Sequence, residues 1–216
     1  MHRMTADAPK TTGSVICWGG IHGARWYDLI GRIISFGRDK AIREKLIELA
    51  APAPGENVLD VGCGTGTLAI AIRPHVGTGE VHGIDASPEM IQVAKEKSAK
   101  DGSGVDFRVA LIEAIPFPDA SFDLVTSSLM LHHLPDDLKA KGSLEIRRVL
   151  KPGGRFMAVD FAAHSRSPVG HVLAIFGHSR GESMVLKLTP ILEDAGFNDV
   201  ECIPTRHKNF AFIRAR

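Results

Sequence analysis

Short apolar runs alternate with helical patterns along most of this chain. The apolar runs predict five strands, at residues 57–61, 80–85, 105–109, 122–127 and 155–160. One helix is predicted after Ser87, an N-cap residue that precedes Pro88 at the first helical position. Another, over residues 135–150, ends at the stop-and-turn signal of residues 151–154. Strands that alternate with helices predict an α/β fold, with a mostly parallel sheet and helices on both faces.

The pattern is different before the first strand. Residues 1–14 are polar and predict a flexible tail. Residues 25–51 predict two helices, and in the second of them Ile42, Leu46 and Leu49 recur at three- to four-residue spacing. This spacing gives the helix an apolar stripe that must pack against the rest of the protein.

The pattern also changes after the fifth strand. Residues 164–180 form a connector, and residues 182–195 predict a helix that ends at Gly196. Residues 197–203 and 209–213 then predict two strands joined by a short polar loop. Because a short loop joins antiparallel neighbours, this hairpin predicts an antiparallel pair at the end of the chain.

Length and composition favour one domain, over residues 15–216. The chain has 216 residues, 44% of them hydrophobic, and a formal net charge of +1, which gives no reason to expect nucleic acid or an anionic membrane as partner. Cys17, Cys63 and Cys202 lack metal-ligand spacing, which argues against a zinc site or a disulfide scaffold. With no secretory signal and no membrane-spanning run, the expected setting is the cytoplasm.

The segment Asp60-Val61-Gly62-Cys63-Gly64-Thr65-Gly66 follows the first strand and opens a helix. Glycines permit positive φ, and the free N–H groups at a helix start bind polar ligand groups. The spacing is GxGxG, with Thr67 where the dinucleotide fingerprint has a glycine. Asp85 ends the next strand, where a carboxylate accepts both hydroxyls of a ribose. This acid indicates nucleotide binding, but by itself it does not identify the reaction.

Six ordered segments carry a resemblance to a known family. They are residues 58–66, 83–90, 115–123, 131–134, 148–154 and 195–197, and residues 25–30 and 35–37 match upstream. The chain resembles the class I S-adenosylmethionine-dependent methyltransferases, and within them the group related to the ubiquinone and menaquinone C-methyltransferases. The resemblance covers roughly residues 25–215 and is much more specific for the superfamily than for the substrate.

This resemblance implies a Rossmann-like seven-stranded sheet whose last strand is antiparallel. It also implies S-adenosylmethionine as the cofactor and S-adenosylhomocysteine as the product. The cofactor-binding residues that it implies are Tyr27, Asp60, Gly62, Cys63, Gly64, Thr65, Gly66, Asp85, Ala86, Met90, Leu111, Ile112, Glu113 and Ser127.

By family position, the glycine turn holds the methionine moiety and Asp85 binds the ribose. Ala86 and Met90 line the adenine, and the backbone of Ile112 meets its edge. Tyr27 and Ser127 contact the amino-acid end.

One position departs from the family pattern. The resemblance places an acidic or amide residue after the third strand, where its oxygen accepts the adenine amino group. Leu111 stands there in this chain, and Glu113 lies two residues further on. Either Glu113 substitutes or the contact is absent, at a cost on the order of 1 kcal/mol.

His132 and His133 follow the fourth strand, at the carboxyl edge where ligands of such sheets bind. Histidine has the pKa range of a general base, and the family position favours His132. The alternative is that one ring packs against the next helix and the other is solvated. His22, His171 and His178 are surface residues or flank an acceptor pocket, and they form no recognisable metal motif.

The apolar run of residues 169–177 is the main indication of the methyl acceptor. As a cover over the site, together with residues 25–51, it favours a small lipophilic or aromatic acceptor. The alternatives are a core segment and a contact in a homodimer. Two other functions also stay open at this point, a nicotinamide-dependent oxidoreductase and a non-catalytic protein that binds S-adenosylmethionine.

Overall fold

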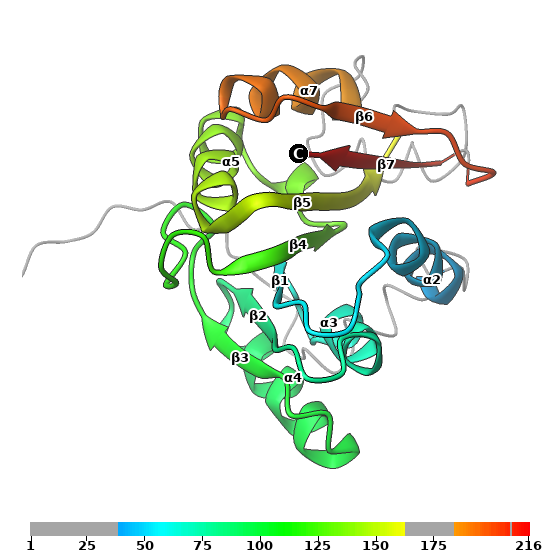
Figure 1. The fold of residues 1–216 in the computed structure, drawn as a ribbon, viewed down its shortest axis with the longest axis vertical. Helices are drawn as coiled ribbons and strands as arrows, with labels where there is room; N and C mark the ends of the chain where they lie inside the picture. Colours follow the sequence, from blue (N-terminus) through cyan, green and yellow to red (C-terminus); the bar gives the residue numbers. More distant parts are fainter. Residues whose placement is uncertain (1–38, 163–183, 208) are drawn as a thin grey trace, which may run out of the picture.

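The computed structural model describes residues 39–162, 184–207 and 209–216 (Figure 1). A seven-stranded sheet in the order β3-β2-β1-β4-β5-β7-β6 runs through them. The strands are β1 (Val58–Val61), β2 (Val81–Asp85), β3 (Asp106–Val109), β4 (Phe122–Ser128), β5 (Leu150–Phe161), β6 (Val200–Ile203) and β7 (Phe210–Ala215). The helices are α2 (Asp39–Ala50), α3 (Thr67–Ile72), α4 (Pro88–Asp101), α5 (Asp136–Val149) and α7 (Met184–Asp194), with short 3-10 turns η1 (Arg73–His75) and η2 (Leu131–His133).

The pairing of the strands confirms the predicted architecture. Strands β1 to β5 are parallel to one another, whereas β7 is antiparallel to both β5 and β6. The chain builds β2 and β3 on one side of β1 and then returns to place β4 and β5 on the other. The carboxyl edge between β1 and β4 is therefore the switch point of the sheet, which is where such folds bind ligands.

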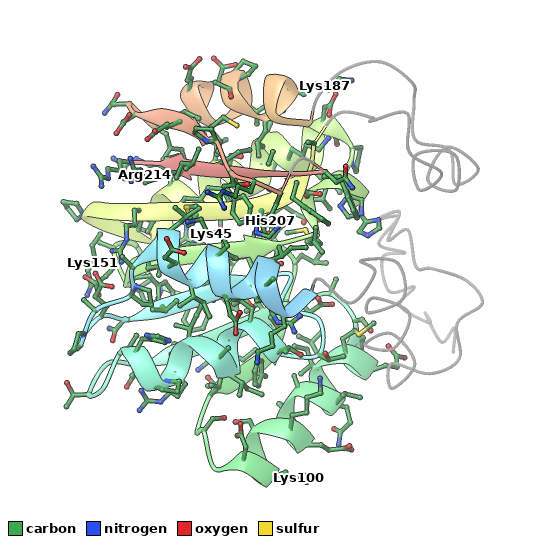
Figure 2. All side chains as sticks on the ribbon, turned by 90° about the vertical axis from the view of Figure 1, so that its right-hand side faces the viewer. Lys45, Lys100, Lys151, Lys187, His207 and Arg214 are labelled. Carbon is green, nitrogen blue, oxygen red and sulfur yellow. The ribbon has the colours of Figure 1, made fainter. Side chains whose placement is uncertain are left out.

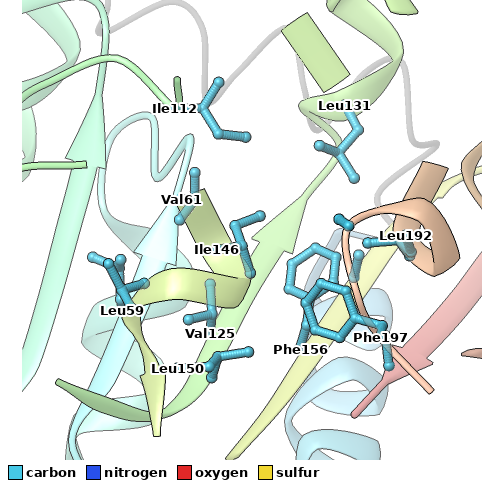
Figure 3. Packing of buried hydrophobic residues seen from close by; sticks show 14 of the residues in the cluster. Leu59, Val61, Ile112, Val125, Leu131, Ile146, Leu150, Phe156, Leu192 and Phe197 are labelled. Carbon is cyan, nitrogen blue, oxygen red and sulfur yellow. The ribbon is translucent and has the colours of Figure 1, made fainter. Parts of the chain in front are cut away.

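Alternation along the strands gives the sheet two apolar faces. Leu59 and Val125 belong to the core under α5 and α7, whereas their chain neighbours Val58 and Leu124 belong to the core under α2, α3 and α4. Figure 1 shows these two groups of helices on opposite sides of the sheet, and Figure 3 shows the first core from close by. Both faces are covered, as the sequence predicts.

Residues 151–154, predicted as the turn that follows the helix, belong to strand β5 in the structure. Helix α5 ends at Val149, and β5 begins at once with Leu150 opposite Phe122. The regular register resumes only where Leu124 faces Arg155, so the intervening residues form an irregular part of β5. Gly153 takes a φ of +81° there. The strand predicted over residues 155–160 is thus longer than expected, because cross-strand pairing with β4 extends it.

Helix α2 is fixed to the face of the sheet. The apolar stripe is confirmed, since Ile42 and Leu46 are fully buried in the core that α2 shares with β5. At the end of the helix, Arg155 donates to the carbonyl oxygens of Ala50 and Ala51, at 2.8 Å each, and it pairs with Glu56. In Figure 2, α2 carries the label Lys45 and faces the viewer.

Several predictions fall outside the described residues. They concern the tail at residues 1–14, the first helix of residues 25–51, the connector at residues 164–180, and the roles of Tyr27, His22, His171 and His178. The role of these segments as a cover over the acceptor site stays a prediction. Within the described parts of the chain, no helix is long and apolar enough to cross a membrane.

Candidate functional site

The glycine turn after β1 is shaped by its backbone. Gly62, Gly64 and Gly66 have φ values of +68°, +52° and +77°. Residues with a Cβ adopt this region only with strain. A Cβ on Gly62 would lie 2.3 Å from Cγ of Met130, and one on Gly66 would lie 2.5 Å from the ring of Phe107. Backbone conformation thus favours glycine at all three positions, and close packing is a second, independent reason at Gly62 and Gly66.

Asp85, at the end of β2, is held against this turn. Its Oδ2 accepts from the backbone N–H of Gly64, and its Oδ1 accepts from that of Ser87, both at 2.9 Å. Burial raises the pKa of this half-buried carboxyl, and the two hydrogen bonds oppose that shift. Each carboxylate oxygen keeps a further lone pair, so a fixed acceptor stands beside the turn. This is the arrangement expected for binding a ribose.

Asp60 lies below the turn rather than on its surface. The residue is only 1% exposed, and its Oδ1 accepts from the hydroxyl of Thr126 on β4 at 2.8 Å. It also accepts from the backbone N–H of Ala69 in α3. Burial raises the pKa of Asp60 to about 7, with a smaller contribution from the charge of Asp85. Asp60 thus joins β1, β4 and the start of α3 beneath the site.

A lysine that the sequence analysis missed also reaches the turn. Lys97 of α4 donates to the hydroxyls of Thr65, at 2.8 Å, and Thr67, at 3.2 Å. Thr67 opens α3, so this ammonium links the turn, the following helix and α4. The residue that replaces the glycine of the dinucleotide fingerprint therefore has a structural partner of its own.

Ser127 has a buried hydroxyl at the switch point of the sheet. It is fully buried near the end of β4, and its Oγ has no hydrogen-bond partner among the described residues. A buried hydroxyl without a partner is costly in a folded protein, so a ligand group that bonds to it would be stabilised. By contrast, burial raises the pKa of the Cys63 thiol, which makes this cysteine a poor nucleophile.

The remaining cofactor candidates lie around the ends of β2 and β3. Ala86 is exposed and Met90 is half-buried, at the start of α4. Leu111 is 40% exposed and Glu113 is half-buried. Ile112 is buried, and its side chain packs against α5 at Gly142. None of these placements tests the contacts that the resemblance implies.

His132, in η2 after β4, is coupled to a buried aspartate. Its ring Nδ1 lies 2.7 Å from Oδ1 of Asp160, and its backbone N–H donates to Oδ2 of the same residue at 3.0 Å. Asp160 is 1% exposed near the end of β5, and its Oδ1 also accepts from the backbone N–H of Phe161. The ring of His133 lies 3.8 Å from that of His132.

This pair has the geometry of a base and its orienting acid. A carboxylate at Nδ1 selects the tautomer that carries its proton there, which leaves Nε2 of His132 as the acceptor. Asp160 was missed because it is 28 residues away in sequence. Its position at the carboxyl end of a predicted strand was the available signal.

Comparison with known proteins identifies the family to which this chain belongs. A family model described as a methyltransferase domain matches residues 58–154. A demethylmenaquinone methyltransferase of Thermus thermophilus is 36% identical over 150 residues, which are 69% of this chain and 67% of that protein. A ubiquinone/menaquinone biosynthesis C-methyltransferase of Hydrogenovibrio crunogenus is 38% identical over 139 residues, 63% of this chain and 54% of that protein. The chain thus spans little more than half the length of this second relative.

Solved structures agree with the fold. An S-adenosylmethionine-dependent methyltransferase from Aquifex aeolicus superposes with a TM-score of 0.70 at 26% identity, over 87% of this chain and 96% of that one. This chain belongs to the class I S-adenosylmethionine-dependent methyltransferases, in the group related to the ubiquinone and menaquinone C-methyltransferases.

Proposed function

We propose that this protein transfers the methyl group of S-adenosylmethionine to a quinol-type aromatic acceptor. The observation that carries the proposal is the oriented base, His132 with Asp160, at the same edge of the sheet as the glycine turn and Asp85. The names of the two relatives support a quinol as the class of acceptor.

The described residues fit this cofactor. Gly62, Gly64 and Gly66 carry no Cβ, so a ligand can approach the backbone of the turn closely at these positions. Asp85 offers carboxylate oxygens for the ribose hydroxyls, and the Ser127 hydroxyl, which has no partner in the described part of the chain, offers a contact for the amino-acid end. Bound S-adenosylmethionine supplies an electrophilic methyl group on a sulfonium.

His132 would act on the acceptor. Its Nε2 removes the proton of a ring hydroxyl, which raises the electron density of both that oxygen and the aromatic ring. Asp160, buried and hydrogen-bonded, stabilises the imidazolium that forms. Loss of the hydroxyl proton is enough for methylation at oxygen, whereas in methylation at a ring carbon the ring hydrogen at that carbon also leaves as a proton, which restores the aromatic ring. The protein's other task is to align the acceptor and exclude water.

The test is methyl transfer to 1,4-naphthohydroquinone, kept reduced under anaerobic conditions, with S-adenosylhomocysteine as the measured product. We expect turnover by the natural protein and a fall in kcat of about 10²- to 10⁴-fold in His132→Asn, with cofactor affinity retained. His82→Asn is the matched control, because His82 also contacts an aspartate, Asp106 at 3.3 Å, but outside the site. Equal losses in both variants would refute the role of His132.

Calorimetry separates this function from its two alternatives. Binding of S-adenosylmethionine and S-adenosylhomocysteine, with none for NAD, is expected. Binding of NAD alone would favour an oxidoreductase, and cofactor binding without turnover of any acceptor would favour a non-catalytic protein. Neither alternative gains support from the relatives named above.

The proposal includes a setting. The acceptor is a small molecule, and the protein works in the cytoplasm without a nucleic-acid partner, which its formal net charge of +1 supports. A homodimer stays open. Gel filtration of the full chain with light scattering would measure its oligomeric state.

A further inference from the structure

Two phenylalanines lie beside the base, at the ends of β5 and β7. Phe161 and Phe210 face each other across the antiparallel pair, with ring centroids 5.4 Å apart and an angle of 32° between the ring planes. The ring of His132 meets Phe161 edge-on, with centroids 4.9 Å apart. The base therefore stands directly against an aromatic pair.

The two phenylalanines are less buried than the apolar residues nearest to them on the same face of β5 and β7. Nearer the middle of the sheet, on the same face of β5 and β7, the side chains of Met157, Val159 and Phe212 are completely buried in the core. Phe161 and Phe210 are only half-buried, and Phe161 belongs to neither of the two core clusters. The pair thus continues the apolar face of the sheet beyond its core, to the carboxyl edge where the base lies.

We infer that Phe161 and Phe210 form the acceptor subsite and hold a planar aromatic ring next to His132. Aromatic rings attract one another in offset-stacked and edge-on arrangements, beyond the effect of buried area. A flat ring that packs on this pair would bring a ring hydroxyl to the neighbouring imidazole. The subsite accordingly selects planar aromatic acceptors over saturated ones of equal size. This inference rests on the proposed function, which identifies the site as the place where the methyl acceptor binds, but it can be tested by binding alone.

The experiment compares two ligands of matched size, 2-naphthol and its saturated counterpart decahydro-2-naphthol. Affinities are measured by calorimetry on the full chain, with S-adenosylhomocysteine present. We expect the natural protein to prefer 2-naphthol. In Phe161→Leu and Phe210→Leu this affinity should fall about fivefold to tenfold, because leucine keeps the apolar contact and removes the ring. The affinity for decahydro-2-naphthol should change less than twofold, and Phe161→Tyr should retain the preference.

Phe117→Leu is the matched control. Phe117 is also half-buried and also meets a histidine edge-on, His82 at 5.0 Å, but it lies in the loop before β4. This variant should bind both ligands as the natural protein does. Affinity for S-adenosylhomocysteine should stay within twofold in every variant, which shows that the fold is intact.

Three outcomes would overturn the inference. They are an equal loss for both ligands, no loss in either leucine variant, and no binding of 2-naphthol to the natural protein. Its failure is distinguishable from that of the proposed function. If the leucine variants methylate 1,4-naphthohydroquinone with unchanged KM, the subsite is wrong and the function stands. If 2-naphthol binding depends on Phe161 but no acceptor is methylated, the subsite stands without the function.

Discussion

The two halves of the site are built in different ways. On the side of β1 to β3, the turn at Gly62–Gly66 and the fixed carboxylate of Asp85 shape the site mainly through backbone conformation and backbone hydrogen bonds. On the side of β4, β5 and β7, side chains do this work, with His132, Asp160 and Phe161 in mutual contact. We expect the first, the cofactor half, to bind one constant ligand. We expect substitutions in the second, the acceptor half, to change the acceptor without disturbing the cofactor.

This difference has a mechanical reason. Residues with a Cβ are strained at the positive φ angles of this turn, so its shape depends mainly on the glycines of the local sequence. The acceptor half depends on contacts between segments far apart in the chain, such as Phe161 with Phe210. Substitutions in the two halves should therefore separate cofactor binding from catalysis, and the following predictions test that separation.

Of the substitutions that follow, Gly66→Ala in the cofactor half should have the largest effect. The new Cβ would meet Phe107 at 2.5 Å and Ala94 at 2.9 Å, at a φ of +77°. Overpacking and strain together should lower the free energy of unfolding by about 3 kcal/mol. Because the turn must move to make room for the new Cβ, we also expect affinity for S-adenosylhomocysteine to fall about 100-fold, which corresponds to about 2.7 kcal/mol of binding free energy.

Gly104→Ala is the control for this substitution. Gly104 has a similar φ of +69°, but no atom of the described residues would lie within 4 Å of a Cβ added there. Only strain remains, at a cost of about 1 kcal/mol, with cofactor affinity unchanged. If denaturant titration and calorimetry gave the same losses for both variants, close packing at Gly66 would have no role.

The corresponding change in the acceptor half is Asp160→Asn. The amide removes the negative charge opposite Nδ1 of His132, and with it the preference for the tautomer that carries its proton on Nδ1. We expect kcat to fall about 10- to 100-fold with cofactor affinity within twofold, measured by steady-state kinetics and calorimetry. Asp106→Asn, at the other histidine–aspartate contact, should leave kcat unchanged. A loss of cofactor affinity in Asp160→Asn would contradict the separation of the two halves.

The two halves also differ in how far the sequence predicts them. The hydroxyl of Ser87 caps α4 through the nearby backbone N–H of Met90, and the glycine turn depends on φ angles within the turn itself. Both roles can therefore be predicted from local sequence. The partners Asp160 and Lys97 could not be assigned, because their contacts depend on the register of the sheet and on the packing of α4. The long β5 was underestimated for the same reason, since pairing with β4 overrides the turn signal around Gly153.

A third prediction concerns charge below the cofactor turn. Burial raises the pKa of Asp60 to about 7, well above the ordinary value near 4, so the folded protein keeps a proton that the unfolded chain has lost. The contribution to stability is therefore complete at low pH and is lost as the pH rises toward 7. Between pH 5 and pH 7.5 the free energy of unfolding should fall by an amount on the order of 2 kcal/mol from this group.

Asp60→Asn, which is neutral at every pH, removes this contribution. Its denaturation free energy should vary less between pH 5 and pH 7.5 than that of the natural protein. Asp85, whose pKa burial also raises, keeps a share of the same sign in both proteins. Parallel pH curves for the two proteins would mean that Asp60 ionises normally, and that the carboxyl below the turn carries a charge.

The smallest effect is expected from substitution of Lys97, whose side chain links the glycine turn of the cofactor half to α4. Lys97→Met removes the ammonium that bonds to Thr65 and Thr67 and should lower the free energy of unfolding by about 1 kcal/mol. If the lysine also positions the turn, affinity for S-adenosylhomocysteine should fall about threefold to tenfold, and Lys97→Arg should restore most of it. Lys100→Met, in the last turn of the same helix, is the control and should change neither quantity. A loss of stability in Lys97→Met without any loss of cofactor affinity would limit this lysine to holding α4. The shape of the turn would then depend on its glycines alone.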